Sequence, residues 1–355
     1  MFIKNKTYQC DLENAIESIP GIESLYGKKF LVTGASGMIA SFIIDLLMYL
    51  SLCRNAEIEV YALGRNEVSI KKRFQSHVGN AGFHIVLQDV TNPIAMEASV
   101  DFIIHAAGDG YPSAFREHPV ETMTPAFIGT LNLLHYAREK KIEKVLLVSS
   151  GEVYGKGDKQ KDGFREKDTG YIDSTSVRSC YPMAKLAAET LLVSYGQEYG
   201  IHTVITRLSH VYGPNFSDKD NRATAQFIRN VVRKKDIVLH SPGQQLRSYT
   251  YIADCASGIL FALLFGEDGQ AYNVANDNSR VTIAEFAECL AAASNKKCIY
   301  EMPTDLERKE QTPLTYAVLN AEKLEKLGWN GKYVISEGMK HLLQILVENG
   351  EDTYG

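Results

Sequence analysis

Clustered cysteines are absent from this sequence of 355 residues. Its six cysteines are Cys10, Cys53, Cys180, Cys255, Cys289 and Cys298. No two of them form a CxxC pair, and zinc sites and disulfide frameworks both need such clustering. The sequence therefore predicts no metal site, and it predicts the reduced thiols of a cytoplasmic protein.

An excess of basic residues is also absent, because 38 Lys and Arg are outnumbered by 43 Asp and Glu. Proteins that bind nucleic acid usually carry a basic face. The few lysine-rich spots, such as residues 71–73, are short enough to belong to single helix faces. We therefore expect no nucleic-acid partner.

Long apolar runs are missing too. The most apolar stretch, residues 38–52, is interrupted by Ser41 and Asp45 and is too short to span a bilayer. Residues 1–7 lack the apolar core of a secretory signal. These absences predict a protein without a membrane partner.

What the sequence does contain is a regular alternation of short apolar strands and amphipathic helices. The composition, 45% apolar and 23% charged, is that of an ordinary globular protein. The strands are expected at 30–32, 59–63, 83–87, 102–105, 145–149 and 203–206, and the clearest helices at 119–140 and 180–199. This pattern predicts an α/β fold with a Rossmann-like, doubly wound and mostly parallel sheet.

The alternation of strands and helices changes along the chain, and this change suggests a division into parts. Residues 1–27 form a lead-in with one amphipathic helix and no assigned role. Residues 28–210 are expected to form the dinucleotide-binding domain, to which a segment at about 245–275 returns. Residues 211–244 and 276–355, with helices near 282–293 and 321–327, are expected to form a smaller mixed lobe that covers the substrate.

A glycine-rich turn follows the first strand. Gly34, Gly37 and Ala40 have the spacing GxxGxxA between a buried strand and an apolar helix. Glycines there let the backbone approach a pyrophosphate at the amino end of the helix, where free amides and the helix dipole favour anions. Ser36, Met38 and Ile39 lie in the same turn and are further candidate cofactor contacts.

The choice between NAD and NADP is left open by the next strands. An acidic residue usually ends the second strand and binds the adenosine ribose of NAD, but here Arg65 follows it and could pair with a 2′-phosphate. Arg65 could equally stack on adenine or point into solvent. Asp89 and Val90 follow the third strand, where they could bind the adenine amino group or cap a helix. The remaining candidate cofactor contacts are Ala106 and Ala107.

Tyr181 and Lys185 are four residues apart on an expected helix, so their side chains share one face. We predict that the ammonium lies near the phenol and lowers its pKa from about 10 toward neutrality. The phenolate would then be a general base. Both residues are therefore candidate catalytic and cofactor-binding residues, although an isolated pair with this spacing is usually an unrelated surface Tyr and Lys.

Ser150 and Glu152 lie at the carboxyl end of a buried strand, where open α/β sheets bind their ligands. Ser150 could hold the substrate hydroxyl that Tyr181 deprotonates. Glu152 could remove an acidified C–H proton beside a ketone or bind a polar group. Glu152 could also be an ordinary solvated carboxylate of a loop.

Together these motifs resemble the extended short-chain dehydrogenases that act on nucleotide sugars. The motifs are TGASGMIA at 33–40, SSGEVYG at 149–155, YPMAK at 181–185 and QQLRSYTYIAD at 244–254. The resemblance covers nearly all of residues 28–330. Residues 178–181, 221–228 and 272–276 are most similar to UDP-glucuronate decarboxylases, and the position of Glu152 also resembles the 4,6-dehydratases.

The resemblance implies a tightly bound NAD, with NADP possible, and a 4-keto sugar intermediate. Tyr181 would take the C4 hydroxyl proton while NAD⁺ takes the hydride. A C5 carboxylate would then leave as CO₂, or Glu152 would remove the C5 proton and water would depart. The implied substrate-binding residues are Ser150, Arg178, His210, Arg222 and Arg247. A homodimer through helices near 120–140 and 180–199 is also implied.

Three departures from the family pattern are visible. Gly151 stands where decarboxylases carry Ser and many dehydratases carry Asp, so a side chain that both reactions normally use is absent. His210 and Ala126 each replace a customary Asn, and Pro125 is expected to disturb its helix. These departures suggest an unusual substrate.

The sequence is also compatible with other functions. Dehydration and 4-epimerisation of a nucleotide sugar are alternatives within the same chemistry. A non-catalytic dinucleotide sensor would use the fold as a binding module, but such proteins typically lose Tyr181 or Lys185. A reductase with dissociable NADPH would suit Arg65.

Overall fold

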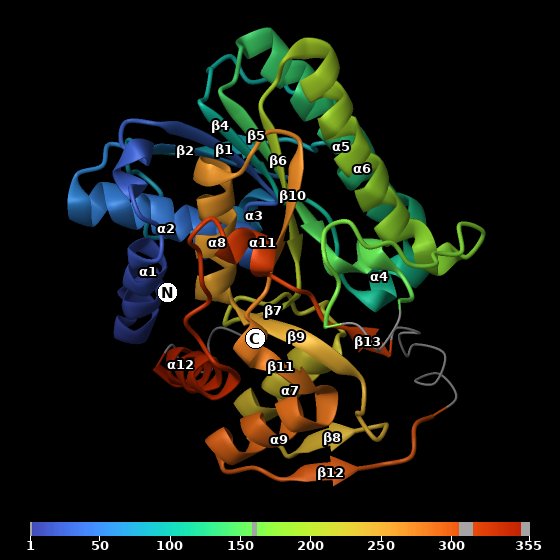
Figure 1. Cartoon of the computed structure of the whole chain (residues 1–355). Helices are drawn as coiled ribbons and strands as arrows, with labels where there is room; N and C mark the ends of the chain where they lie inside the picture. The colour runs from blue at the N-terminus through green and yellow to red at the C-terminus, as the bar shows by residue number, and fades with distance from the viewer. Residues whose placement is uncertain (1, 158–161, 305–314, 349–355) are drawn as a thin grey trace.

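The computed structural model describes residues 2–157, 162–304 and 315–348, and its centre is a parallel sheet of seven strands (Figure 1). The strand order is β10-β6-β5-β4-β1-β2-β3, and every neighbouring pair is parallel. The strands are β1 (Lys29–Thr33), β2 (Glu59–Gly64), β3 (Phe83–Leu87), β4 (Phe102–His105), β5 (Lys144–Ser150), β6 (Thr203–Leu208) and β10 (Gln270–Val274). The predicted doubly wound sheet is confirmed.

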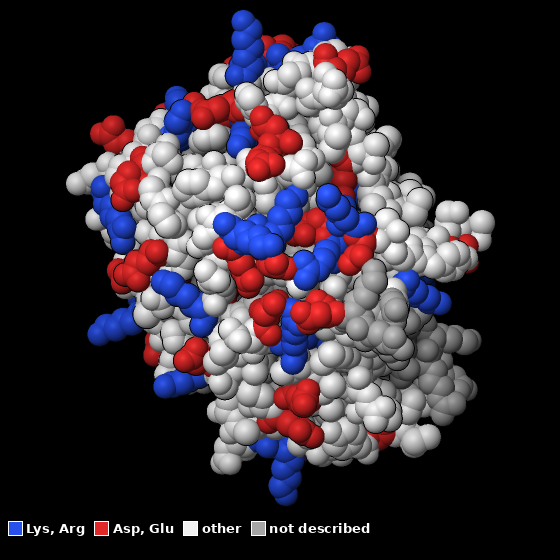
Figure 2. Space-filling view, in the orientation of Figure 1, with Lys and Arg blue, Asp and Glu red and all other residues white. Residues whose placement is uncertain are grey.

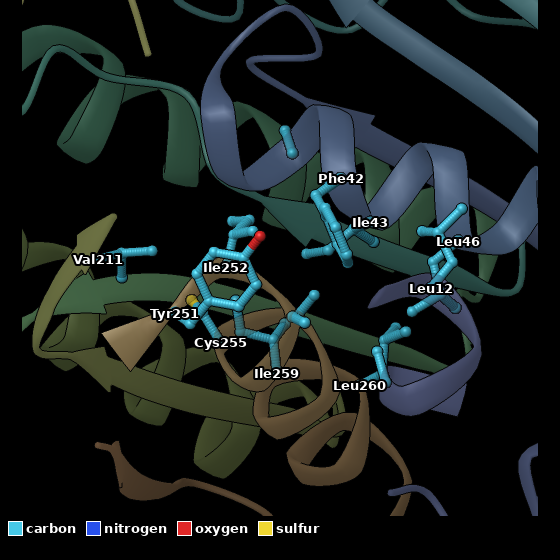
Figure 3. Close-up of a cluster of buried hydrophobic side chains, with 14 of the residues drawn as sticks. Leu12, Phe42, Ile43, Leu46, Val211, Tyr251, Ile252, Cys255, Ile259 and Leu260 are labelled. Atoms are coloured by element: carbon cyan, nitrogen blue, oxygen red, sulfur yellow. The ribbon is translucent and has the colours of Figure 1, made fainter. Parts of the chain in front are cut away.

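Helices cover both faces of this sheet because its strands are apolar on both sides. The helices are α2 (Met38–Arg54), α3 (Glu67–Arg73) and α8 (Ile252–Phe265) on one face, and α5 (Pro119–Lys140) and α6 (Cys180–Tyr199) on the other. Phe30 and Val32 of β1 pack toward α2 and α8, whereas Leu31 between them packs toward α5 and α6. Figure 3 shows the core where α2 and α8 meet. Burial of each such side chain contributes about 1.5–3 kcal/mol.

The amino-terminal lead-in folds as the predicted helix, α1 (Lys6–Glu17), and joins the core. Its buried Asp11 accepts hydrogen bonds from Tyr251 (2.6 Å) and Tyr333 (2.8 Å) and contacts His341 Nδ1 at 2.6 Å. Tyr8 donates a hydrogen bond to Asp45 of α2 at 2.7 Å. The lead-in thus connects the helices of the central sheet to the carboxyl-terminal helix α12 (Ile335–Glu348).

A second part lies beside the carboxyl ends of the strands (Figure 1). Its strands are β7 (His210–Tyr212), β9 (Leu246–Tyr251), β11 (Arg280–Thr282) and β13 (Tyr316–Ala317) in one sheet, and β8 (Ile237–Leu239) and β12 (Cys298–Tyr300) in another. Its helices include α7 (Ala223–Val232), α9 (Ile283–Ser294) and α11 (Glu322–Glu325). The helix expected at 282–293 is confirmed as α9, which Thr282 and Glu285 begin with a capping box. The helix expected at 321–327 is shorter.

The expectation that Pro125 disturbs its helix is wrong. Helix α5 continues through Pro125, and the chain bends instead at His118, between α4 (Pro112–Glu117) and α5. Proline has no amide hydrogen, so the Glu121 carbonyl loses its intrahelical donor while the helix continues. The Pro125 carbonyl accepts a further hydrogen bond from His105 Nε2 at 3.1 Å.

Charges on the surface are mixed in sign. On the face shown in Figure 2, Lys and Arg side chains lie next to Asp and Glu in clusters of mixed sign, with uncharged surface between the clusters. Among the described residues, no helix is both long enough and apolar enough to cross a bilayer.

Candidate active site

A cavity of about 250 Å³ lies at the carboxyl ends of β1, β4 and β5, between the central sheet and the second part. Among the residues predicted from the sequence, those that line it are Gly34, Gly37, Met38, Ile39, Ala106, Ser150, Glu152, Tyr181, Lys185, His210 and Arg222. The structure therefore brings both candidate catalytic motifs and the glycine turn to one cavity. Ser36, Arg65, Asp89, Val90, Ala107, Arg178 and Arg247 lie outside its lining.

The glycine turn has the shape that a dinucleotide requires. Gly34 has a φ of +70°, and a Cβ there would come within 2.8 Å of the Ala106 carbonyl oxygen. Gly37 begins α2 without a side-chain cap, so the first amides of the helix are available to an anion. The turn and the amino end of α2 therefore fit the pyrophosphate of a dinucleotide.

A polar network beside this turn was missed by the sequence analysis. Thr33 Oγ1 donates to His105 Nδ1 at 2.7 Å and accepts from the amides of Ala106 and Ala107, each at 3.2 Å. Burial, with the Lys185 charge, lowers the pKa of His105 to about 3, so the ring is neutral and Nε2 donates to Pro125. The sequence signal that could have indicated this network is a Thr and a His that each stand at the end of an apolar strand.

The candidate adenosine contacts lie at the ends of β2 and β3. Arg65 Nη1 lies 3.7 Å from Asp89 Oδ2. Partial burial acts to raise the pKa of Asp89. The hydrogen bonds from Thr91 and the charge of Arg65 outweigh burial, so the pKa of Asp89 is lowered. Val90 is buried, and its carbonyl accepts from Asn132 Nδ2 at 3.0 Å. The Val90 side chain thus belongs to the core between the sheet and α5.

We predict that Arg65→Ala selectively weakens NADP⁺ binding. The Arg65 side chain is 63% exposed and its ion pair is long, so it is available to a 2′-phosphate. Loss of charge-assisted hydrogen bonds should lower NADP⁺ affinity roughly tenfold, with NAD⁺ affinity nearly unchanged. Calorimetric titration measures both, and Lys71→Ala on α3 is the control for removal of one positive charge. An equal loss for the two cofactors would contradict the prediction.

Tyr181 and Lys185 share a face of α6, as predicted, but the expected effect on the phenol is not found. Lys185 is buried, donates to the Val148 carbonyl at 2.8 Å, and lies 5.9 Å from the centre of the Tyr181 ring. Burial and the Glu152 charge raise the pKa of Tyr181 to about 12. A hydrogen bond with Ser150 opposes this shift. The prediction of a lowered phenol pKa is therefore wrong for this arrangement, because desolvation dominates.

Lys185 responds to the same desolvation. Burial lowers the pKa of its ammonium to about 8, and Glu189 acts to raise it. Loss of charge near neutral pH is thus easier for Lys185 than for an exposed lysine.

Glu152 is held by an arginine. Arg178 Nη1 donates to Glu152 Oε2 at 2.9 Å and Nη2 donates to Oε1 at 2.8 Å. Arg178 also lies over the ring of Phe115, 4.6 Å from its centre, and Phe115 stacks on Tyr181 with ring centres 4.9 Å apart. The ion pair and the two rings join the turn that follows β5, helix α4 and the start of α6 around the phenol.

The other predicted substrate residues form two polar pairs. Arg247 Nη1 donates to His210 Nε2 at 3.0 Å, and burial together with the Arg247 and Arg222 charges holds the pKa of His210 well below its usual range. His210 is therefore a neutral acceptor. Arg222 is bound by Asp220, whose carboxylate accepts from Nε at 3.0 Å. Arg247 is 4% exposed, and burial lowers its pKa.

Gly151 has an apolar neighbour in place of the missing side chain. A Cβ at Gly151 would come within 3.0 Å of Leu319 Cδ2 and 3.3 Å of the Leu208 carbonyl oxygen. Leu319 is buried and lines the cavity next to Ser150. The wall of the cavity at this point is therefore apolar.

Comparison with known proteins places this site in a family. The profile of the NAD dependent epimerase/dehydratase family matches residues 30–275. The chain belongs to this family. UDP-glucuronic acid decarboxylase 5 of Arabidopsis thaliana is 31% identical over 315 residues, covering 88% of this chain and 87% of the relative. UDP-glucuronic acid decarboxylase 3 of the same plant is 30% identical over 334 residues, covering 92% and 93%.

Solved structures share the fold of this epimerase/dehydratase family member. A UDP-glucuronic acid 4-epimerase from Bacillus cereus, in complex with UDP-glucuronic acid and NAD, matches with a TM-score of 0.75 at 22% identity and covers 91% of this chain and 100% of its own. A dTDP-glucose 4,6-dehydratase from Bacillus anthracis, in complex with NAD, matches with a TM-score of 0.74 at 22% identity, covering 92% and 98%.

The predicted resemblance, the enzyme class and the NAD cofactor are confirmed by these findings. The protein is an NAD-dependent enzyme of the epimerase/dehydratase family. The reading as a non-catalytic dinucleotide sensor is set aside.

Proposed function

We propose that this enzyme transiently oxidises C4 of a nucleotide sugar and decarboxylates UDP-glucuronate. The observation that carries the proposal is the convergence of Ser150, Glu152 and Tyr181 on the cavity that also contains the glycine turn. Relatives at about 30% identity are UDP-glucuronic acid decarboxylases, and this supports the choice of reaction.

The proposed chemistry assigns one role to each residue. Bound NAD⁺ would supply the hydride acceptor for oxidation at C4 and the hydride donor for its reversal, and its positive charge would favour a phenolate. Tyr181, which hydrogen-bonds with Ser150, takes the C4 hydroxyl proton as general base. Lys185 would bind the cofactor beside Tyr181, and Gly34, Gly37 and the start of α2 would hold the pyrophosphate.

Decarboxylation suits the wall around Gly151 better than dehydration does. CO₂ leaves a β-keto acid without a proton donor, whereas departing hydroxide needs one. Gly151 offers no acidic side chain, and Leu319 occupies the adjacent space. Dehydration and 4-epimerisation are the alternative outcomes of the experiment below.

The substrate contacts are proposed from charge. Arg247 and Arg222 would donate charge-assisted hydrogen bonds to the diphosphate. His210, the neutral acceptor bound to Arg247, would orient that guanidinium. Arg178 would hold the side chain of Glu152 in position beside the sugar.

We also propose that the chain is divided into a part that binds NAD and a part that binds the nucleotide sugar. Residues 28–210 with about 245–275 would bind NAD, and residues 211–244 with 276–355 would bind the nucleotide sugar. All six cysteines are free, which supports a reducing, cytoplasmic location.

Mass spectrometry tests the reaction directly. The purified enzyme is incubated with UDP-glucuronate and, separately, with dTDP-glucose, and the dinucleotide released on denaturation is identified. Loss of one CO₂ from UDP-glucuronate is expected. Loss of one water would indicate dehydration, and an unchanged mass with altered sugar configuration would indicate epimerisation. No conversion of UDP-glucuronate would contradict the proposal.

We further propose a homodimer formed through α5 and α6, which pack side by side on the outer face (Figure 1). Their outer surface exposes large apolar side chains. These are Val120, Met123, Phe127 and Ile128 on α5 and Val193 and Tyr199 on α6. Exposed apolar side chains gathered on neighbouring helices often mark a protein interface.

The dimer is tested by light scattering. Wild type should have twice the chain mass of 39.5 kDa, and Phe127→Glu should be a monomer because a charge would be buried at the interface. Val68→Glu, at an exposed position on α3, is the control and should remain dimeric. A dimer that persists in Phe127→Glu would place the interface elsewhere.

A further inference from the structure

A second cavity, of about 280 Å³, lies next to the first. It is lined by Glu152, Gly155, Lys156, Tyr171, Ile172, Asp173, Ser176, Arg178, Ser179 and Pro182. Glu152 is the residue that lines both cavities. Neither the sequence motifs nor the chemistry proposed for the first cavity gives the second cavity a role.

The ion pair of Glu152 and Arg178 separates the two cavities. Arg178 lines only the second, so its guanidinium approaches Glu152 from that side. The rim includes the exposed residues Lys156, Tyr171 and Asp173, so the second cavity opens to solvent. Glu152 therefore stands between the cavity proposed to hold the sugar and a solvent-open space.

The proposed reaction needs a proton from solvent. When the bond between C5 and its carboxylate breaks, CO₂ leaves and the electron pair forms an enolate with the C4 ketone. C5 must then take one proton, so each turnover consumes a proton from bulk water. Tyr181 exchanges its proton with the C4 oxygen and does not supply this one.

We propose that the second cavity is the route by which Glu152 exchanges protons with bulk water. Glu152 gives its proton to C5 and regains one through the second cavity, and Arg178 holds the carboxylate in position between these steps. The inference rests on the proposed reaction at C5, but it applies equally if the C5 proton is removed before water departs.

Filling the second cavity tests this route. Ser176→Leu places an apolar side chain in the cavity, and Ser174→Leu changes an exposed residue of the same loop that does not line it. Reactions are run in D₂O with UDP-glucuronate. The readouts are turnover, KM, the absorbance of NADH formed on C4 oxidation, and deuterium at C5 of the product.

We expect wild type and Ser174→Leu to incorporate deuterium at C5. Ser176→Leu should lower turnover roughly tenfold with an unchanged KM, because proton exchange is slowed while C4 oxidation proceeds and NADH accumulates. Ile172→Phe, a second filling variant, should behave in the same way. A general folding defect would instead reduce NADH formation.

Two results would overturn the route. One is equal turnover in Ser176→Leu, Ile172→Phe and Ser174→Leu, and the other is a wild-type product without deuterium at C5. With dTDP-glucose as the substrate, whose C6 hydroxyl can leave, deuterium at C5 of a product that has lost water, without conversion of UDP-glucuronate, would refute decarboxylation and support the route.

Discussion

Tyr181→Phe should lower turnover of the nucleotide sugar by roughly 10²- to 10⁴-fold, the range for loss of a general base. The phenol lies in the cavity with Ser150 and Glu152, and phenylalanine keeps the ring that stacks on Phe115 while removing the hydroxyl. Steady-state turnover measured by mass spectrometry tests this effect.

The control for Tyr181→Phe is Tyr300→Phe, which removes a hydroxyl from an exposed residue of β12 that lines neither cavity. It should retain full activity. NAD content should be similar in wild type and both variants, because the glycine turn is untouched. Turnover of Tyr181→Phe near that of wild type would remove the phenol from the mechanism.

Glu152→Gln should lower turnover by about 10²-fold and cause a 4-keto sugar to accumulate. The amide has the shape of the carboxylate but cannot exchange the C5 proton, so C4 oxidation should continue while the later step is slowed. The ketone is measured after reduction with borodeuteride, which adds a deuterium at C4.

A matched control separates the chemistry from the loss of an ion pair. Glu143→Gln breaks the surface pair in which Lys28 Nζ lies 2.8 Å from Glu143, and it should leave activity unchanged. The Glu152→Gln variant also leaves Arg178 half-buried without its carboxylate, so its thermal stability is compared as well. Normal turnover in Glu152→Gln would reduce Glu152 to a structural partner of Arg178.

The central sheet could be predicted because its signals are local. Short apolar strands alternate with amphipathic helices, and α5 and α6 were placed at the observed residues. The glycine turn, Ser150, Tyr181 and Lys185 could be predicted as one site because the carboxyl ends of parallel strands meet at one edge.

Long-range pairings could not be predicted in this way. The contacts of Glu152 with Arg178 and of Thr33 with His105 join residues far apart in the sequence, and nothing local selects these partners. The Tyr181 pKa depends on burial by several elements, so the spacing to Lys185 gave the wrong direction. The effect of Pro125 was overestimated because the surrounding helix tolerates one lost donor.

The buried carboxylate of Asp11 has a consequence for how relatives of this enzyme can vary. Tyr251, Tyr333 and His341 all direct polar atoms to it. A relative without the first helix would leave two hydroxyls and an imidazole without this carboxylate, at a cost of about 1–3 kcal/mol for each of these groups that stays buried. Relatives that lack the first helix should therefore carry Phe or Leu at those of the three positions that stay buried.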